Sequence, residues 1–209
     1  MNIIQKISSW QYTRYPWILL IIVSAGLVVL AHSFFQHYLY MPPCEQCVYI
    51  RFAFLCMTLG GILATINPKK NYFTLPGYAF AFWGAIQGIM YSVKLARIHA
   101  AAHSDDPFGV QGCSTDPTYP FNLPLHIWAP DWFLPTGDCG FENSVIPDGV
   151  TLNSIQEYFI NLYQDGWYLI PSKHFMSMAD STLLGFVVCF IVLLVLFTSK
   201  IITTVKNPK

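Results

Sequence analysis

Four long apolar segments dominate the pattern of hydrophobic and polar positions along the chain. A helix needs about 20 predominantly apolar residues to cross the hydrocarbon core of a bilayer, and each segment reaches or approaches that length. The segments run over about 15–35, 47–66, 72–93 and 182–198. The pattern therefore predicts four transmembrane helices, with a short connection after each of the first two and a long one after the third.

The first segment has an alternative interpretation as a cleaved signal peptide. Its apolar run, YPWILLIIVSAGLVVLAHSFF, is longer than the roughly 7 to 15 residues of a signal core, and no A-x-A cleavage site follows it. We therefore interpret the segment as a membrane helix that the protein retains.

Basic residues gather on one side of this predicted topology. The two tails and the loop between the second and third segments contain Lys6, Arg14, Lys69, Lys70, Lys200, Lys206 and Lys209. Cytoplasmic loops of membrane proteins carry an excess of Lys and Arg, so we expect both termini in the cytoplasm. The exoplasmic loops then cover about 36–46 and 94–180, and all 11 acidic residues lie between Glu45 and Asp180.

The composition agrees with a membrane protein. Hydrophobic residues make up 54% of the 209 residues and charged residues only 11%, too little charge for the surface of a soluble domain. The expected fold is an all-α membrane protein, a four-transmembrane-helix bundle in which 1–209 form a single membrane domain. We expect contact with membrane lipid and no nucleic-acid partner.

The long exoplasmic loop divides into two parts. Its first half is rich in Pro, Gly and Asp, which indicates turns and extended backbone, yet it also contains Trp128, Trp132 and Phe133. Such aromatic content suits a self-packed loop core, a headgroup-region segment or a partner surface. In the second half, apolar residues at helical spacing from Leu152 to Leu162 predict a short amphipathic helix, which could pack on the membrane domain or lie on lipid.

The six cysteines separate by predicted position. Cys56 and Cys189 fall within membrane segments, where free cysteine often behaves as a small buried apolar residue. The other four lie on the exoplasmic side, where oxidising conditions allow disulfides to persist. These four, Cys44, Cys47, Cys113 and Cys139, are the candidates for chemistry.

Cys44 and Cys47 form a C-x-x-C motif at the boundary of the second segment, and several kinds of site use this motif. A zinc site would need a second ligand pair, which His99 and His103 could supply. A c-type haem site requires His directly after the second cysteine, and Val48 stands there. A disulfide that closes so small a loop adds little stability, which favours an exchangeable redox disulfide over a structural bridge.

Arg51 follows Cys47 by four residues and therefore lies on the same helix face, about 6 Å deeper. An arginine at mid-bilayer costs roughly 2.5 to 3.5 kcal/mol, and less near the edge. The side chain could reach back to the headgroups. Alternatively, its charge could stabilise a Cys47 thiolate and an electron-rich ligand beside it, such as a lipid-soluble quinone.

Cys113 and Cys139 share the long loop, in QGCSTDP and TGDCGFE, and turn residues flank both. They could form a structural staple. They could also form a second disulfide that faces outward and exchanges electrons with a soluble protein.

Three stretches resemble the bacterial membrane thiol oxidases of the DsbB family: FQHYLYMPPCEQCVYIRF, WGAIQGIMY and LPLHIWAPDWFLPTGDC. The resemblance covers most of the chain up to about Gly140 and includes four segments in the same order. The stretch from about 141 to 178 is longer than in typical members, which favours the DsbI branch.

This resemblance implies specific roles for the candidate residues. Cys44 and Cys47 would form the quinone-facing disulfide, with Arg51 and Cys47 nearest the quinone, either ubiquinone or menaquinone. Cys113 would receive the thiolate of a periplasmic thioredoxin-fold protein similar to DsbA or DsbL. Cys139 would then attack Cys44.

The expected function is therefore that of a protein-dithiol:quinone oxidoreductase in the bacterial inner membrane, with both termini cytoplasmic. It would reoxidise a soluble dithiol oxidase and pass two electrons to the quinone. The alternative is a membrane scaffold or transport component whose exoplasmic disulfides are only structural.

Overall fold

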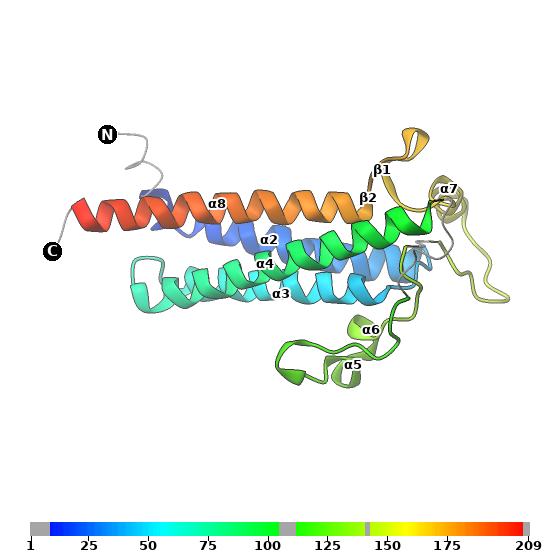
Figure 1. The fold of residues 1–209 in the computed structure, drawn as a ribbon, viewed down its shortest axis with the longest axis horizontal. Helices are drawn as coiled ribbons and strands as arrows, with labels where there is room; N and C mark the ends of the chain where they lie inside the picture. The colour runs from blue at the N-terminus through cyan, green and yellow to red at the C-terminus, as the bar shows by residue number, and fades with distance from the viewer. Residues whose placement is uncertain (1–8, 105–111, 141–142, 207–209) are drawn as a thin grey trace. The chain divides into compact units, whose positions relative to one another are not determined.

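The computed structural model describes residues 9–104, 112–140 and 143–206, and helices account for most of them. Lys6 and Lys209, used above for the orientation, lie outside these ranges, as do the first two residues of the 141–178 extension. The helical and strand elements in chain order are α2 (Tyr15–Val29), η1 (Leu30–Tyr38), α3 (Glu45–Ile66), α4 (Asn71–Ala102), η2 (Pro120–Asn122), α5 (Leu125–Trp128), α6 (Pro130–Phe133), α7 (Ser154–Leu162), β1 (Tyr168–Ile170), η3 (Pro171–Lys173), β2 (Phe175–Ser177) and α8 (Met178–Lys206) (Figure 1).

Among the described residues, three stretches of helix are long and apolar enough to cross a membrane: Tyr15–Tyr38, Glu45–Ile66 and Met178–Val205. These stretches contain the first, second and fourth predicted segments. The third predicted segment lies in α4, which has 32 residues and includes Pro76 but is not among the three. Helix α4 also continues to Ala102, beyond the expected start of the long loop at residue 94.

The chain divides into two compact units. Unit 1 contains Met1–Leu27, Ala53–Gln87 and Gly185–Lys209, and unit 2 contains Val28–Phe52 and Gly88–Leu184. All four candidate cysteines and Arg51 belong to unit 2.

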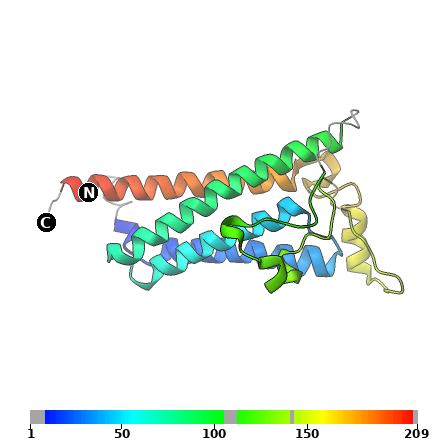
Figure 2. The same cartoon turned by 60° about the horizontal axis from the view of Figure 1, so that its bottom comes forward.

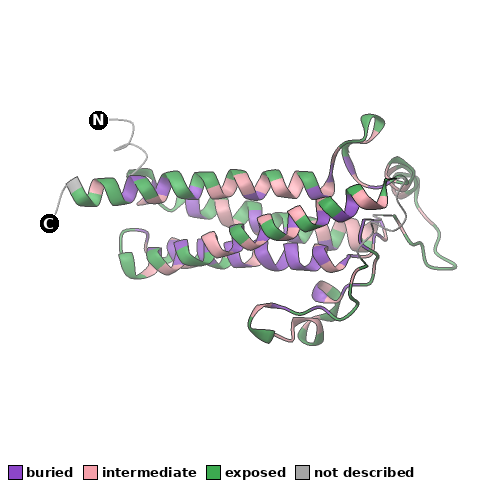
Figure 3. Ribbon diagram, in the orientation of Figure 1, coloured by how far each residue is buried: buried purple, intermediate pink, exposed green. Residues whose placement is uncertain are grey.

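Unit 1 has an aromatic and aliphatic core to which α2, α3, α4 and α8 all contribute. Its buried members are Trp17, Ala64, Tyr78, Ala81, Leu193 and Leu196. The long apolar window of α3 is 72% buried, whereas those of α2 with η1 and of α8 are only 17% buried, a contrast visible in Figure 3. Exposed apolar helix faces of this kind suit contact with lipid, because backbone groups are already bonded within each helix.

Two glycines let α3 and α4 approach closely within unit 1. A Cβ added to Gly60 would lie 2.5 Å from the carbonyl oxygen of Gly77, and one added to Gly77 would lie 2.8 Å from the carbonyl oxygen of Gly60. Small residues at helix contacts allow this backbone approach, which drives much of helix association in membranes.

Unit 2 contains η1, the start of α3, the end of α4 and the long loop, whose course with α5 and α6 can be followed in Figure 2. Helix α7 occupies the stretch for which the spacing predicts an amphipathic helix. An Asn153–Gln156 capping box begins it. Its Gln156 Nε2 donates to the carbonyl oxygen of Tyr38 at 3.0 Å, and Phe159 packs against Phe34 of η1. This helix therefore packs on a neighbouring helix, although Ile155 and Tyr158 stay exposed.

A short antiparallel hairpin, β1–β2, precedes α8 and pairs Tyr168 with Ser177 and Ile170 with Phe175. The sequence pattern did not predict it. Three-residue strands are too short to show a clear alternation of apolar and polar positions.

We predict that Gly60→Ala destabilises the protein, because the new methyl group forces α3 and α4 apart. Overpacking of this kind costs about 1–3 kcal/mol, to be measured by thermal unfolding in detergent. Gly26→Ala is the matched control, since a Cβ at position 26 meets nothing within 4 Å. That variant should be neutral or slightly more stable because Ala favours helix over Gly; equal losses in both would contradict the packing explanation.

Candidate functional site

The first sulfur pair lies at the N-terminus of α3. Cys44 and Cys47 form a disulfide with their Cα atoms 4.9 Å apart. Helix α3 begins at Glu45, so Cys44 occupies the N-cap position, and the backbone N–H of Cys47 donates to Cys44 Sγ at 3.1 Å. Free N–H groups at a helix start favour a negatively charged sulfur, so this position suits a cysteine that becomes a thiolate when the pair is reduced.

The second sulfur pair joins the two ends of the first half of the long loop. Cys113 and Cys139 form a disulfide with their Cα atoms 5.8 Å apart. The sequence alone left open whether a bridge between these two cysteines is structural or exchangeable, and the structure forms both pairs that the family resemblance implies. Cys56 and Cys189 are free thiols, in line with the structural role expected for them.

The four sulfurs differ in their access to solvent. Cys139 and Cys44 are buried, with 4% and 3% of their surfaces exposed. Cys113 and Cys47 are intermediate. One member of each pair is thus accessible from outside the protein core while the other is shielded.

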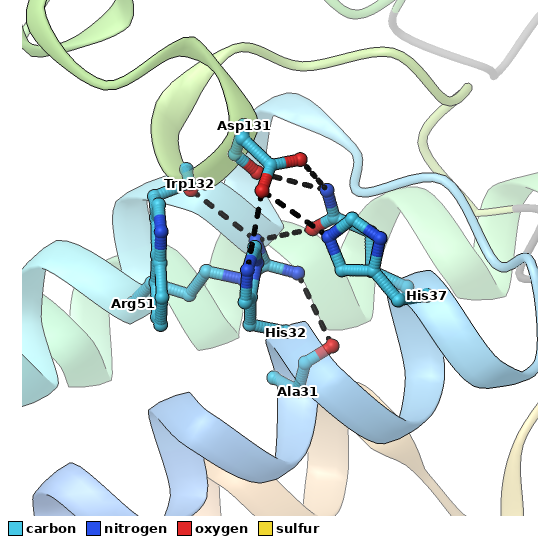
Figure 4. A network of polar contacts seen from close by, with 7 residues as sticks. Ala31, His32, His37, Arg51, Asp131 and Trp132 are labelled. Carbon is cyan, nitrogen blue, oxygen red and sulfur yellow. Dashed lines mark hydrogen bonds and ion pairs between the residues drawn. The ribbon is translucent and has the colours of Figure 1, made fainter.

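Arg51 is held by the protein and does not extend toward solvent. Its residue surface is only 5% exposed. Nη1 donates to Gln36 Oε1 at 2.7 Å and to the carbonyl oxygen of Trp132 at 3.2 Å, and Nη2 donates to the carbonyl oxygen of Ala31 at 3.4 Å (Figure 4). All three partners are neutral oxygens. Within the described part of the chain, Arg51 makes no direct salt bridge, although the Asp131 carboxylate lies close enough to interact with its charge.

Arg51 Nε is buried and has no hydrogen-bond partner among the residues that the structure describes. A buried donor without a partner costs about 1–3 kcal/mol, so a ligand oxygen that accepts from Nε would remove this penalty.

A carboxylate bridges two histidines next to Arg51. Asp131 Oδ2 lies 3.3 Å from His32 Nε2 and 3.2 Å from His37 Nε2 (Figure 4). Gln36 Nε2 donates to the Asp131 carbonyl oxygen at 2.8 Å and to Asp131 Oδ1 at 3.3 Å. Because Gln36 also accepts from Arg51, the guanidinium, the amide, the carboxylate and both imidazoles form one network.

The π-helical form of η1 explains why His32 and His37 reach the same carboxylate. Backbone hydrogen bonds in a π-helix join residues five apart, so residues five apart lie about one turn from each other. In an α-helix the same spacing would turn the two side chains about 140° apart. The imidazole of His32 also stacks on Trp132, with ring centroids 3.6 Å apart, which fixes its orientation.

His32, His37 and Asp131 also have the donor types that zinc uses, and their candidate ligand atoms lie within 4.8 Å of one another. The neighbouring Arg51 opposes a divalent cation, because its charge has no salt-bridge partner among the described residues. The sequence interpretation assigned no role to these three residues, although His37 and Asp131 stand inside the quoted family stretches.

A cavity of about 340 Å³ lies beside this network. Gln36 and His37 line it, together with Tyr40, Pro42, Thr136 and Val145. Gln36 and His37 thus belong both to the network and to the lining of the cavity.

Tyr119 holds the loop that carries Asp131 and Trp132. Its hydroxyl donates to the carbonyl oxygen of Phe133 at 2.6 Å. Burial raises the pKa of Tyr119, and nearby Tyr49 adds to the effect. The phenol therefore stays protonated at neutral pH and remains a donor.

Comparison with known proteins decides the family. The model of the family "Disulfide bond formation protein DsbB" matches residues 13–196. The chain belongs to the DsbB family. It is 58% identical over 192 residues to the protein-disulfide oxidoreductase DsbI of Salmonella typhimurium strain LT2, covering 90% of this chain and 85% of that protein. It is 54% identical over 192 residues to DsbI of Escherichia coli O1:K1, covering 90% of this chain and 86% of that protein.

This membership confirms the family resemblance and the predicted disulfide-forming oxidoreductase activity. The chain is a disulfide-forming membrane oxidoreductase, and its two disulfides fit that activity. A purely structural function for the protein is therefore excluded.

We predict that Asp131→Asn lowers stability by about 1 kcal/mol, because it weakens bonds to both imidazoles and to Gln36 at a side chain that is 56% exposed, where solvent screens part of the effect. The measurement is chemical unfolding in detergent. Asp116→Asn is the matched control: Asp116 Oδ1 lies 3.6 Å from His126 Nε2, and its side chain is 87% exposed. Exposed pairs contribute little, so this control should change stability by less than about 0.5 kcal/mol. Equal effects in the two variants would contradict the network.

Proposed function

We propose that the protein reoxidises a periplasmic thioredoxin-fold dithiol protein similar to DsbA or DsbL and passes two electrons to a membrane quinone, ubiquinone or menaquinone. The electrons would travel from the Cys113–Cys139 pair to the Cys44–Cys47 pair. The observation that carries the proposal is the difference in burial among the four sulfurs. Cys113 is partly exposed, whereas Cys139 and Cys44 are buried. Cys47 lies one turn before Arg51 on α3.

The first exchange takes electrons from the soluble partner. A partner thiolate attacks Cys113 Sγ, and Cys139 leaves as a thiolate. The partner's second thiolate then attacks the mixed disulfide, so the partner departs oxidised and Cys113 and Cys139 are left reduced. Attack proceeds at the sulfur that the thiolate can reach, and Cys113 is the more exposed member of its pair.

The second exchange moves the electrons inward. Cys139 attacks Cys44, and Cys47 leaves as a thiolate. Cys113 then attacks Cys139, which restores the outer disulfide and releases the Cys44 thiolate. The N–H of Cys47, which already donates to Cys44 Sγ, stabilises that thiolate.

The residues around Arg51 suit a quinone. A bound quinone supplies a lipid-soluble acceptor for two electrons and two protons, and its reduction accompanies re-formation of the Cys44–Cys47 disulfide. Within the described ranges, Arg51 Nε is a buried donor without a partner, and the positive charge of Arg51 favours an electron-rich ligand and the Cys47 thiolate. Arg51 and Cys47 are therefore the residues that we propose for the quinone side.

The proposed topology has four spans. We infer that α4 crosses the bacterial inner membrane as well as the three more apolar helices, because it is longer than a span requires. Arg14, Lys69, Lys70 and Lys200 then lie at the cytoplasmic side, in accord with the distribution of positive charge. Both termini would be cytoplasmic, and both disulfides would face the periplasm.

We predict that Arg51→Ala slows quinone reduction by roughly 100-fold, because it removes the positive charge that stabilises developing anions. The measurement is quinone absorbance during turnover with a reduced thioredoxin-fold protein. Oxidation of that protein by the outer disulfide in a quinone-free single turnover is the control and should keep its rate. Normal turnover of the variant at limiting quinone would remove Arg51 from this role.

The full electron route gives a second prediction. Cys44→Ser and Cys113→Ser should each abolish quinone reduction by the reduced partner, since each breaks a different disulfide of the same series. Cys56→Ser is the control, because Cys56 is a free thiol, and it should retain activity. Quinone reduction that survives Cys113→Ser would show that electrons bypass the outer pair.

A further inference from the structure

The backbone on both sides of the Cys113–Cys139 disulfide is hydrogen-bonded to residues that flank Cys44. On one side, the N–H of Ser114 donates to Glu45 Oε2 at 3.0 Å. On the other, the N–H groups of Thr136 and Gly137 donate to the carbonyl oxygen of Pro43 at 2.9 and 3.0 Å. The backbone beside the outer disulfide is thus bonded to Pro43, directly before Cys44, and to Glu45, directly after it.

Glu45 acts together with Tyr49, one turn along α3. The Tyr49 hydroxyl donates to Glu45 Oε1 at 3.2 Å and accepts from the N–H of Thr118 at 2.8 Å. The carboxylate therefore uses one oxygen for the loop and the other for a side chain that also holds the loop. Hydrogen bonds to an ionised carboxylate are roughly twice as strong as neutral ones, and a carboxylate in the first turn of a helix is further stabilised by the helix dipole.

Gly137 makes the attachment to Pro43 possible. A Cβ at position 137 would run into the carbonyl oxygen of Pro42. The backbone at Gly137 can therefore approach the Pro42–Pro43 segment only without a side chain.

We propose that the Pro43 carbonyl, the Glu45 carboxylate and the Tyr49 hydroxyl form a clamp that positions the outer disulfide for exchange with Cys44. The proposal rests on the function above and adds positioning residues to it. Holding reactants together makes an exchange effectively unimolecular. It also keeps Cys139 and Cys44, the two buried sulfurs, away from soluble thiols that would otherwise intercept them.

The clamp predicts an effect on one step only. The Cys139 thiolate attacks Cys44 Sγ, a Cys139–Cys44 bond forms, and the Cys44–Cys47 bond breaks with its electron pair on Cys47. The attack of the soluble partner on Cys113 does not depend on the clamp. Loss of Glu45 should therefore slow the transfer between the pairs and leave oxidation of the partner unchanged.

The test compares the full-length wild-type protein with the Glu45→Ala and Glu45→Gln variants. All three proteins are kept in detergent without quinone. One equivalent of a reduced thioredoxin-fold protein is added, and the free thiols are alkylated at set times and assigned by mass spectrometry. We expect Glu45→Ala to slow the appearance of thiols at Cys44 and Cys47 by about tenfold. Glu45→Gln should stay within about threefold of wild type, because the amide oxygen can still accept from Ser114.

Hydrogen exchange of the Ser114 amide provides a readout that does not depend on catalysis, and Glu45→Ala should reduce its protection. Asp138→Ala is the matched control, since Asp138 is an exposed acid next to Cys139 outside the clamp; it should behave as wild type.

Wild-type transfer in Glu45→Ala would overturn the clamp, and so would equal slowing by the Ala and Gln variants. If the wild-type protein moves no electrons between the pairs, the proposed function itself fails. That result is distinct from a failure of the clamp alone, in which wild type transfers electrons and the Glu45 variants do so at the same rate.

Discussion

A guanidinium that is always charged and almost wholly buried determines the local structure around the inner disulfide. Arg51 lies one turn beyond Cys47 on α3, and its Nη atoms bond to neutral oxygens of Ala31, Gln36 and Trp132. Removing a charge from water is expensive unless hydrogen bonds replace the lost hydration. The wide turns of η1 and the position of the short helix α6 supply those oxygens without a direct salt bridge, and the Asp131 carboxylate reaches the guanidinium only through Gln36. Arg51 can therefore act on a thiolate or an electron-rich ligand.

The chemistry of the two sulfur pairs follows from differences in burial. Thiol–disulfide exchange needs access for the attacking thiolate, and only Cys113 in the outer pair is accessible to a soluble protein. Cys139 and Cys44 are shielded, so the exchange proposed between them would be restricted to groups that the protein brings together. The hydrogen bonds from Ser114 to Glu45 and from Gly137 to Pro43 make the connection between the pairs part of the fold. In the proposed mechanism, this arrangement would separate the exchange with the soluble partner, which occurs at an accessible sulfur, from the exchange between the two pairs, which occurs at shielded sulfurs.

The network of His32, His37 and Asp131 helps to position the groups that bond to Arg51. Asp131 precedes Trp132, whose carbonyl oxygen accepts from Arg51, and it accepts the amide of Gln36, a second partner of Arg51. A substitution of Asp131 would therefore alter the hydrogen bonds of the guanidinium, although Asp131 does not bond to it directly. The stacking of His32 on Trp132 joins the loop to η1, so the long loop contributes to the site as a positioned element.

The sequence by itself determined the features that depend on local pattern. The length of the apolar segments indicated membrane helices, helical spacing located α7, and Cys44, Cys47 and Arg51 lie so close along one helix that their arrangement follows from helix geometry. The resemblance to the family implied roles for Cys113 and Cys139, and these roles stay predictions. Tertiary structure decided the partners of Arg51, the carboxylate shared by His32 and His37, and the attachment of the outer disulfide to Pro43 and Glu45. These contacts join residues far apart along the chain, such as Gln36 with Asp131 and Glu45 with Ser114. Spacing within one segment cannot encode them, because they exist only once the loop has packed against η1 and the start of α3.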